Sequence, residues 1–166
     1  MKEILKKLSG KIAKLPQSCF FNEPADAETI AALEEKFGIS LPPSYKEFLL
    51  LHNGGFISLY EIDSEEELAD AAWNSNYIFG LGEIDEAFAS INYKTDGMDV
   101  KYIPFMHTAD GEYLGFRHPL EEDDSAVYDL WHEAPATEWA DSVLYKNFHD
   151  MLKEYLARNG EIETIG

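Results

Sequence analysis

The residues best suited to chemistry in this chain are one cysteine, Cys19, and five histidines. The histidines are His52, His107, His118, His132 and His149. No two of them have the i, i+4 spacing that places two ligands on one helix face, and no Cys-x-x-Cys occurs. Cys19 has no recognisable nucleophile motif around it, and there is no Gly-x-Ser-x-Gly. The sequence therefore predicts a non-catalytic protein with no metal site and no cofactor.

Two glycine-containing segments could suggest ligand binding, but neither has the complete pattern. Gly80-Leu81-Gly82 lacks the third glycine and the lysine of phosphate-binding loops, and we interpret it as a turn. Asp96-Gly97-Met98-Asp99 lacks the ligand spacing of a calcium-binding loop. Neither segment predicts a binding site.

Charge is the strongest signal in the composition. The formal net charge is -19, and residues 1–14 contain five of the 13 basic residues and only one acid. The rest of the chain has a net charge of -23. Such a surface repels nucleic acid directly and attracts a basic partner. Acidity that only maintains solubility is an equally weighted alternative.

Tryptophan beside acidic residues is the pattern that suggests a protein-binding surface. Tryptophan contributes strongly to binding energy, and neighbouring acids suit a basic partner. The candidate contact residues are Asp63, Glu66, Glu67, Asp70, Trp73, Glu122, Asp123, Asp124 and Trp139. The alternative is that the tryptophans belong to the core; we favour it for Trp73 and Trp131 and weigh it evenly for Trp139.

Hydrophobic periodicity predicts the elements that must position these residues. Helices are expected at 3–15, 26–37, 64–73 and 142–158, with another that begins near Leu41-Pro42-Pro43 and ends at Asn53-Gly54-Gly55. Strands are expected at 56–62, 77–84, 102–107, 112–117 and 126–131, while 85–93 is ambiguous. The order predicts a single α+β domain with a mainly antiparallel sheet covered by helices.

Asp110-Gly111 between two apolar runs predicts a hairpin with a two-residue turn. That turn would place His107 opposite Leu114 and Phe105 opposite Phe116. Ile103, Phe105, Leu114 and Phe116 would share a core-facing side of the sheet.

The first twenty residues are predicted to form a basic amphipathic helix and its connection, and 21–166 the α+β domain. We expect the helix to dock on its own domain, although a basic amphipathic helix can also lie on a membrane surface. There is no signal-peptide pattern and no apolar run long enough to span a bilayer, so we expect a cytoplasmic protein. Cys19 is expected to be a small buried residue.

Residues 31–55 resemble the N-terminal signature of the SUKH superfamily. The matching residues are Glu34, Gly38, Leu41, Pro42, Tyr45, Leu49, Asn53, Gly54 and Gly55. The resemblance extends more loosely to Ile103-Pro104-Phe105, Asp110-Gly111, Val127 and the last helix. It implies an α+β fold and a function in binding other proteins. The motif residues are structural by their chemistry, so the resemblance supports the fold more than any site.

The resemblance also suggests a role. Many bacterial members are similar to immunity proteins encoded beside polymorphic toxins, including nucleases, and fungal members resemble regulators of cell-wall assembly. We therefore predict an immunity protein that occludes a basic cognate toxin, with no direct nucleic-acid binding and no membrane insertion. The alternative is a regulatory or scaffold protein that binds an endogenous partner.

Overall fold

The computed structural model describes residues 1–120 and 124–165 of the chain. Its α-helices are α1 (Lys2–Lys14), α2 (Ala27–Phe37), α3 (Pro43–Leu49), α4 (Glu65–Trp73), α5 (Leu81–Asn92) and α6 (Phe148–Ala157). Its strands are β1 (Cys19–Phe21), β2 (Gly55–Ile57), β3 (Tyr77–Ile78), β4 (Lys101–His107), β5 (Tyr113–His118), β6 (Val127–Asp129) and β7 (Val143–Tyr145). Short 3₁₀ helices occupy Tyr93–Thr95 and Ala136–Asp141. The predicted α+β class is confirmed.

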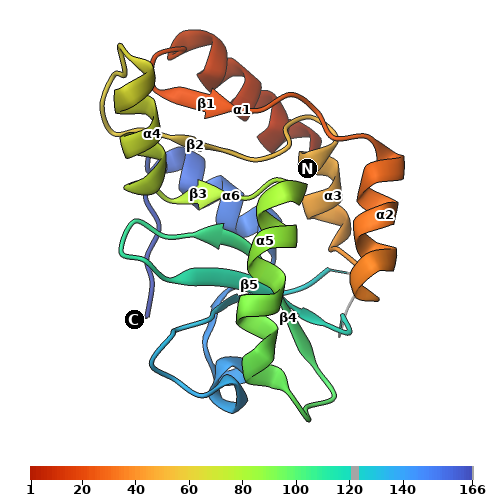
Figure 1. Ribbon diagram of the computed structural model, residues 1–166. Helices are drawn as coiled ribbons and strands as arrows, with labels where there is room; N and C mark the ends of the chain where they lie inside the picture. The colour runs from red at the N-terminus through yellow and green to blue at the C-terminus, as the bar shows by residue number, and fades with distance from the viewer. Residues whose placement is uncertain (121–123, 166) are drawn as a thin grey trace.

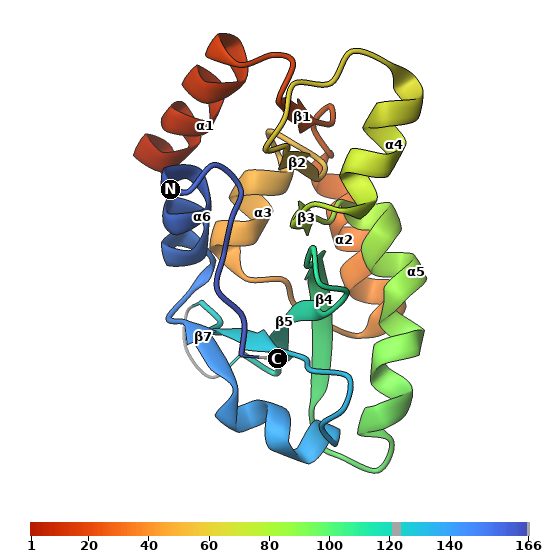
Figure 2. The same ribbon diagram turned by 90° about the vertical axis from the view of Figure 1, so that its left-hand side faces the viewer.

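The strands of these described residues form one antiparallel sheet in which spatial order follows chain order, from β1 to β7 (Figure 1). Figure 2 shows helices on both sides of it, with α5 against one face and α3 and α6 against the other. Helix α4 lies on the same side as α5, near the β2–β3 end of the sheet.

The main core lies between the sheet and helices α3 and α6. Phe105 and Phe116, on neighbouring strands, stack with ring centroids 4.1 Å apart, and Tyr45 and Phe148 pack over them from the helices. A second cluster surrounds Trp139, whose ring meets that of Tyr102 edge to face at 5.3 Å. Both clusters are rich in aromatic residues, which bury large apolar areas and fix the sheet against its helices.

Several helix ends follow the local signals. Asp26 caps α2 by accepting a hydrogen bond from the Thr29 N–H at 2.7 Å, and Gly38 ends it in the left-handed conformation with φ of 61°. Ser64 caps α4 by accepting from the Glu67 N–H at 3.2 Å. These ends were predictable because a cap depends on residues within one turn.

Three predicted elements are corrected. The strand predicted at 77–84 ends at Ile78, and Gly80, which we interpreted as part of a turn, is the N-cap of α5. The last helix begins at Phe148 and not near residue 142, since Asn147 caps it and the preceding residues form β7. The strand predicted at 56–62 runs only from Gly55 to Ile57.

The predicted hairpin register is also wrong. His107 pairs with Tyr113 and Ile103 with Phe116, because the Thr108 N–H donates to the Glu112 carbonyl at 2.8 Å and closes a longer loop. A register shift between Pro104 and Met106 places Ile103 opposite Phe116, so that these two side chains share one face of the sheet. The four residues predicted for the core, Ile103, Phe105, Leu114 and Phe116, are accordingly all fully buried.

Helix α1 packs its apolar face on its own domain. Ile4, Leu5 and Leu8 are buried in the main core, α1 contacts α6, and Lys11 Nζ lies 2.6 Å from the Asn159 side-chain oxygen. Cys19 is buried at the start of β1, and burial raises the pKa of its thiol. Within the described ranges, no helix has the length and apolar character needed to cross a membrane.

Candidate functional site

Helix α4 is the least integrated helix of the fold. None of its nine residues is buried, and its first turn contains three acids, Glu65, Glu66 and Glu67. Negative charge there suits the helix dipole, and Ser64 supplies the cap. Local interactions therefore support a helix whose outer surface is exposed to solvent.

A groove of about 460 Å³ lies between α4 and α5. We call it the α4–α5 groove. One wall comes from α4, the other from α5, and aromatic side chains of the sheet form its floor. Its lining residues are Ala69, Ala72, Trp73, Tyr77, Phe79, Glu83, Glu86, Ala87, Ser90, His107 and Tyr113.

The floor is a row of rings across three neighbouring strands. Tyr77 of β3 is paired with His107 of β4, which is paired with Tyr113 of β5, so their side chains point to the same face. The rings of Tyr77 and His107 stack with centroids 5.6 Å apart and planes 10° apart. Phe79 meets Tyr113 edge to face at 6.1 Å. Sheet register brings Tyr77, His107 and Tyr113 together.

Trp73 forms the outer edge of the same aromatic surface. Its ring lies 5.9 Å from that of His107, yet the residue is 77% exposed. An exposed tryptophan beside an aromatic hollow has the geometry of a protein-binding hot spot. The expectation that Trp73 belongs to the core is therefore wrong.

The α5 wall brings carboxylates to the groove. Glu83, Glu86 and Ser90 follow one another at helical spacing on the same helix face. Glu83 is held in place, because it accepts hydrogen bonds from the Tyr77 hydroxyl at 3.1 Å and the Gly80 N–H at 3.0 Å. Burial, with the nearby Glu83 charge, raises the pKa of Tyr77 to about 12.

His107 is uncharged at neutral pH. Burial lowers the pKa of its imidazole, outweighing the opposing effects of backbone hydrogen bonding and of Glu83. Nε2 lies 3.1 Å from the Ala72 carbonyl oxygen and must carry the proton to make that hydrogen bond. The floor is thus neutral and aromatic, with negative charge at its α5 side.

Motif residues outside the groove hold its parts in position. The buried Tyr45 hydroxyl donates to the Phe79 carbonyl at 2.6 Å, and the Leu81 N–H donates to the Asn53 side-chain oxygen at 2.8 Å. A Cβ at Gly54 would lie 2.4 Å from the Gly80 nitrogen. These contacts fix residues 79–81, from which Phe79 enters the groove and α5 begins.

Five of the predicted contact residues lie on or next to α4. Glu66, Asp70 and Trp73 lie at positions i, i+4 and i+7 of one helix face. Asp63 precedes the Ser64 cap, and Glu67 is in the first turn. All five are exposed, and within the described ranges none of the four acids forms an ion pair. By contrast, Asp85 of α5 is paired with Lys36 at 2.7 Å.

The structure does not bring the other predicted contact residues to this surface. Asp124 is hydrogen-bonded to Ser44 of α3, and Figure 2 shows α3 on the opposite side of the sheet from α4. Trp139 is 0% exposed and donates from Nε1 to the Trp131 carbonyl at 3.1 Å, so it is a core residue and not a contact residue. Glu122 and Asp123 lie outside the described residues.

Sequence reasoning missed most of the groove. Glu83 and Glu86 have a helical spacing that would have been informative if residues 81–92 had been recognised as a helix. Tyr77, His107 and Tyr113 have no local signal, because they come from three separate strands. Tyr77 meets His107 through the pairing of β3 with β4, and His107 meets Tyr113 through a hairpin register that the Asp-Gly turn predicted incorrectly.

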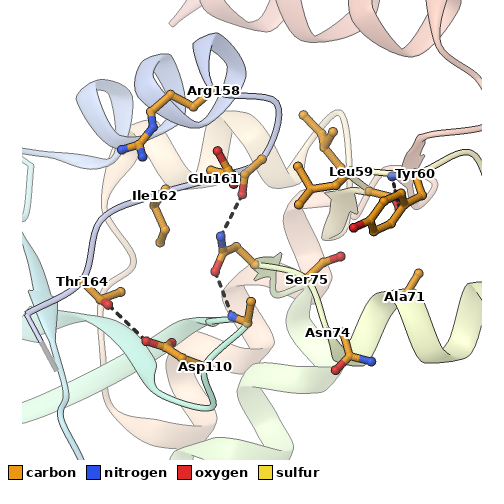
Figure 3. Close-up of a pocket in the computed structure, with 15 residues that line it drawn as sticks. Leu59, Tyr60, Ala71, Asn74, Ser75, Asp110, Arg158, Glu161, Ile162 and Thr164 are labelled. Carbon is orange, nitrogen blue, oxygen red and sulfur yellow. Dashed lines mark hydrogen bonds between the residues drawn. The ribbon is translucent and has the colours of Figure 1, made fainter.

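A second hollow of about 350 Å³ lies on the other side of α4 (Figure 3). Leu59 and Tyr60 form one rim, and the C-terminal segment with Glu161 and Ile162 forms the other. The Asn76 side chain bridges this region, donating to the Gly160 carbonyl and accepting from the Ala109 N–H, both at 2.9 Å. This hollow has no cluster of aromatic rings and carboxylates like that of the α4–α5 groove.

Metal binding finds no support in the described part of the chain. No group of three or more His, Cys, Asp or Glu residues there is arranged to hold a metal ion. His132 contacts the buried Glu112, but the two provide only a pair of side chains. What the α4–α5 groove offers is aromatic surface with negative charge beside it.

An α+β domain with an acidic, aromatic groove fits a class of proteins that act by binding partners. A family model of the SMI1/KNR4 family (SUKH-1) matches residues 24–154, and the chain belongs to this family. Proteins of the family bind partner proteins and are generally non-catalytic. The predicted SUKH resemblance is confirmed.

A similar protein is the uncharacterized protein YnaB of Bacillus subtilis (strain 168). The two are 50% identical over 34 residues, which is 20% of this chain. The match spans about a quarter of that relative, 24% of its length.

Proposed function

We propose that this protein is an immunity protein that binds a basic toxin through the α4–α5 groove and the acidic surface of α4. The bound protein blocks the toxin's active site by occupying the surface around it. A nuclease is the toxin class we favour, because surfaces that bind nucleic acid are basic. We place this encounter in the cytoplasm.

The observation that carries the proposal is the exposure of Trp73 at the edge of the groove, next to unpaired acids. A large apolar side chain left in water is costly unless a partner covers it. The acids around it have no cationic neighbours in ion-pair contact within the described residues, so they remain available to basic side chains of a partner. Together these features combine a hot-spot residue with electrostatic steering.

The test is a growth assay in which the protein is co-expressed with a toxin encoded beside its gene. We expect the wild-type protein to rescue growth. The double variant Glu66→Lys and Asp70→Lys reverses charge beside Trp73, and we expect it to lose rescue or to require much higher expression.

The matched control is Glu138→Lys with Asp141→Lys, which changes the net charge equally on a different part of the surface. Rescue by this control together with failure of the α4 variant supports the proposal. Equal rescue by both variants would remove α4 from the interface. Failure of the wild-type protein against every adjacent toxin would reject the immunity function.

A further inference from the structure

The geometry points to a binding site for one cationic side chain of the partner, an arginine, in the part of the α4–α5 groove lined by Trp73, Tyr77, His107 and Glu83. We call this site the seat. This inference rests on the proposed function for the identity of the partner. The cation-binding property itself belongs to the groove and can be measured without the partner.

The rings offer aromatic surface to a planar cation. Tyr77 and His107 stack with nearly parallel planes, 10° apart, and the Trp73 ring lies 5.9 Å from that of His107 at a tilt of 44°. Tyrosine and tryptophan faces attract a cation within about 6 Å of the ring centre, and several rings together form an aromatic cage. A guanidinium group can stack on such rings, which favours arginine over the compact ammonium of lysine.

The Glu83 carboxylate is held in position beside the aromatic rings that the guanidinium would contact. Glu83 lines the groove, and its position is set by hydrogen bonds from the Tyr77 hydroxyl and the Gly80 N–H. Each carboxylate oxygen has a second lone pair, so Glu83 can still accept from a guanidinium. Glu86, exposed on the same helix face, adds a second negative charge.

Among the described residues that line the groove, no positive charge competes for the seat at neutral pH. The described residues that line the groove include no lysine or arginine. His107 is neutral because burial lowers its pKa, although Glu83 acts in the opposite direction. Tyr77, which is paired with His107 on the neighbouring strand, is uncharged as well, because burial raises its pKa to about 12. A neutral aromatic floor with a carboxylate at its side favours a cation over an apolar group.

The experiment is an NMR titration of the full chain with N-acetyl-arginine amide, using N-acetyl-citrulline amide as the uncharged analogue of the same shape. The Trp73 indole N–H is assigned from its absence in Trp73→Phe. We expect saturable shifts of the Trp73 indole and the His107 ring with arginine, and at least tenfold weaker binding of citrulline. Equal shifts with both probes, or no shift of these groups, would overturn the inference.

Charge-matched variants separate the seat from general attraction to an acidic protein. Glu83→Gln should reduce arginine binding at least fivefold, whereas Glu138→Gln should leave it unchanged. Because Glu83 also bonds the Gly80 N–H, Glu86→Gln serves as a second variant that leaves this bond intact, with a smaller loss expected. Equal losses in Glu83→Gln and Glu138→Gln would show nonspecific attraction and reject the seat.

The two proposals can fail separately. Arginine binding that depends on Glu83, in a protein that neutralises no toxin, would keep the seat and reject the immunity function. Toxin neutralisation that depends on the α4 acids, without preference for arginine over citrulline, would keep the function and reject the seat.

Discussion

Individual polar contacts hold the floor of the groove in place. The Tyr45 hydroxyl bonds the Phe79 carbonyl inside the core, and the Tyr77 hydroxyl joins β3 to Glu83 of α5. His107 connects the floor to the end of α4 through the Ala72 carbonyl. Each contact links a groove residue to a different element, so changes at these positions report on the site as well as on stability.

Tyr45→Phe removes one buried hydrogen bond and leaves the ring packing intact. The Phe79 carbonyl then loses its partner in a fully buried environment, and we expect the free energy of unfolding to fall by about 1–3 kcal/mol. Urea denaturation measures the change. Tyr93→Phe, at an exposed position, is the control and should change stability by less than about 0.5 kcal/mol. A loss in Tyr45→Phe no larger than in the control would contradict the role of the bond.

His107 predicts a pH dependence of stability. Burial holds the pKa of this imidazole below its usual value, so the unfolded chain binds protons more readily than the folded one. The stability associated with neutral His107 is present above about pH 6.5 and is lost as pH falls through the lowered pKa. Glu83, which faces His107 from α5, opposes this shift but is the weaker influence.

His107→Gln is the test, because a glutamine amide nitrogen can take the place of Nε2 and donate to the Ala72 carbonyl. We expect the free energy of unfolding to fall less in this variant than in the wild type between pH 7.5 and pH 5.5. Denaturation curves at both pH values measure the difference. An identical fall in both proteins would contradict a buried, neutral His107.

Helices α4 and α5 serve the groove in different ways. α5 is anchored at its start by Asn53, Gly54 and Glu83 and buries one face against the sheet. α4 has no buried residue and presents acids and Trp73 outward. The groove therefore has one wall, α5, that is anchored in the core, and one wall, α4, that has few buried contacts. A helix with few buried contacts can shift more easily to fit a partner.

Gly54→Ala tests the anchoring of α5. Gly54 has φ of 86°, and its added Cβ would meet the Gly80 nitrogen at 2.4 Å. The matched control is Gly97→Ala, with φ of 79° and nothing within 4 Å of its Cβ. We expect a loss of about 1–2 kcal/mol in the control, from backbone strain alone, and at least about 3 kcal/mol in Gly54→Ala. Calorimetric melting measures both, and equal losses would show that the close approach to Gly80 is unimportant.

The elements differ in how far the sequence predicts them. The caps at Asp26, Gly38 and Ser64 were correct, because each depends on neighbours within a turn. Residues 77–84 were misassigned as one strand, because the contact that marks the start of α5, from the Leu81 N–H to the distant Asn53 side chain, has no local signal. The groove floor escaped prediction because a strand register joins Tyr77, His107 and Tyr113 across 36 residues of chain. Of the candidate contact residues, only those on or beside α4 came together.

At the scale of the whole molecule, charge is distributed unevenly. The lysines of α1 lie on a helix packed against α6, while the remainder of the chain carries a net charge of -23. The acids of α4 contribute to a field that would draw in a basic partner from a distance. Steering of this kind accelerates association and is weakened by salt.

The association rate with the toxin should therefore fall as salt rises. Between 50 and 500 mM NaCl we expect about a tenfold or larger decrease for the wild type, measured by stopped-flow fluorescence. The double variant Glu66→Lys and Asp70→Lys should associate more slowly at low salt, and its association rate should change less with salt concentration than that of the wild type. A rate that does not change with salt would contradict electrostatic steering.

The central claim is that the partner docks on the α4–α5 groove, and Trp73 gives the most direct measurement. The experiment compares the affinity of the wild-type protein, Trp73→Ala and Tyr60→Ala for the toxin that the wild type neutralises. Tyr60 is the control because it is equally exposed, at 76%, but lines the hollow on the other side of α4. We predict that Trp73→Ala weakens binding by at least about 2 kcal/mol, roughly thirtyfold, and that Tyr60→Ala changes it by less than about 0.5 kcal/mol. Unchanged affinity in Trp73→Ala, with or without a loss in Tyr60→Ala, would contradict docking at this groove.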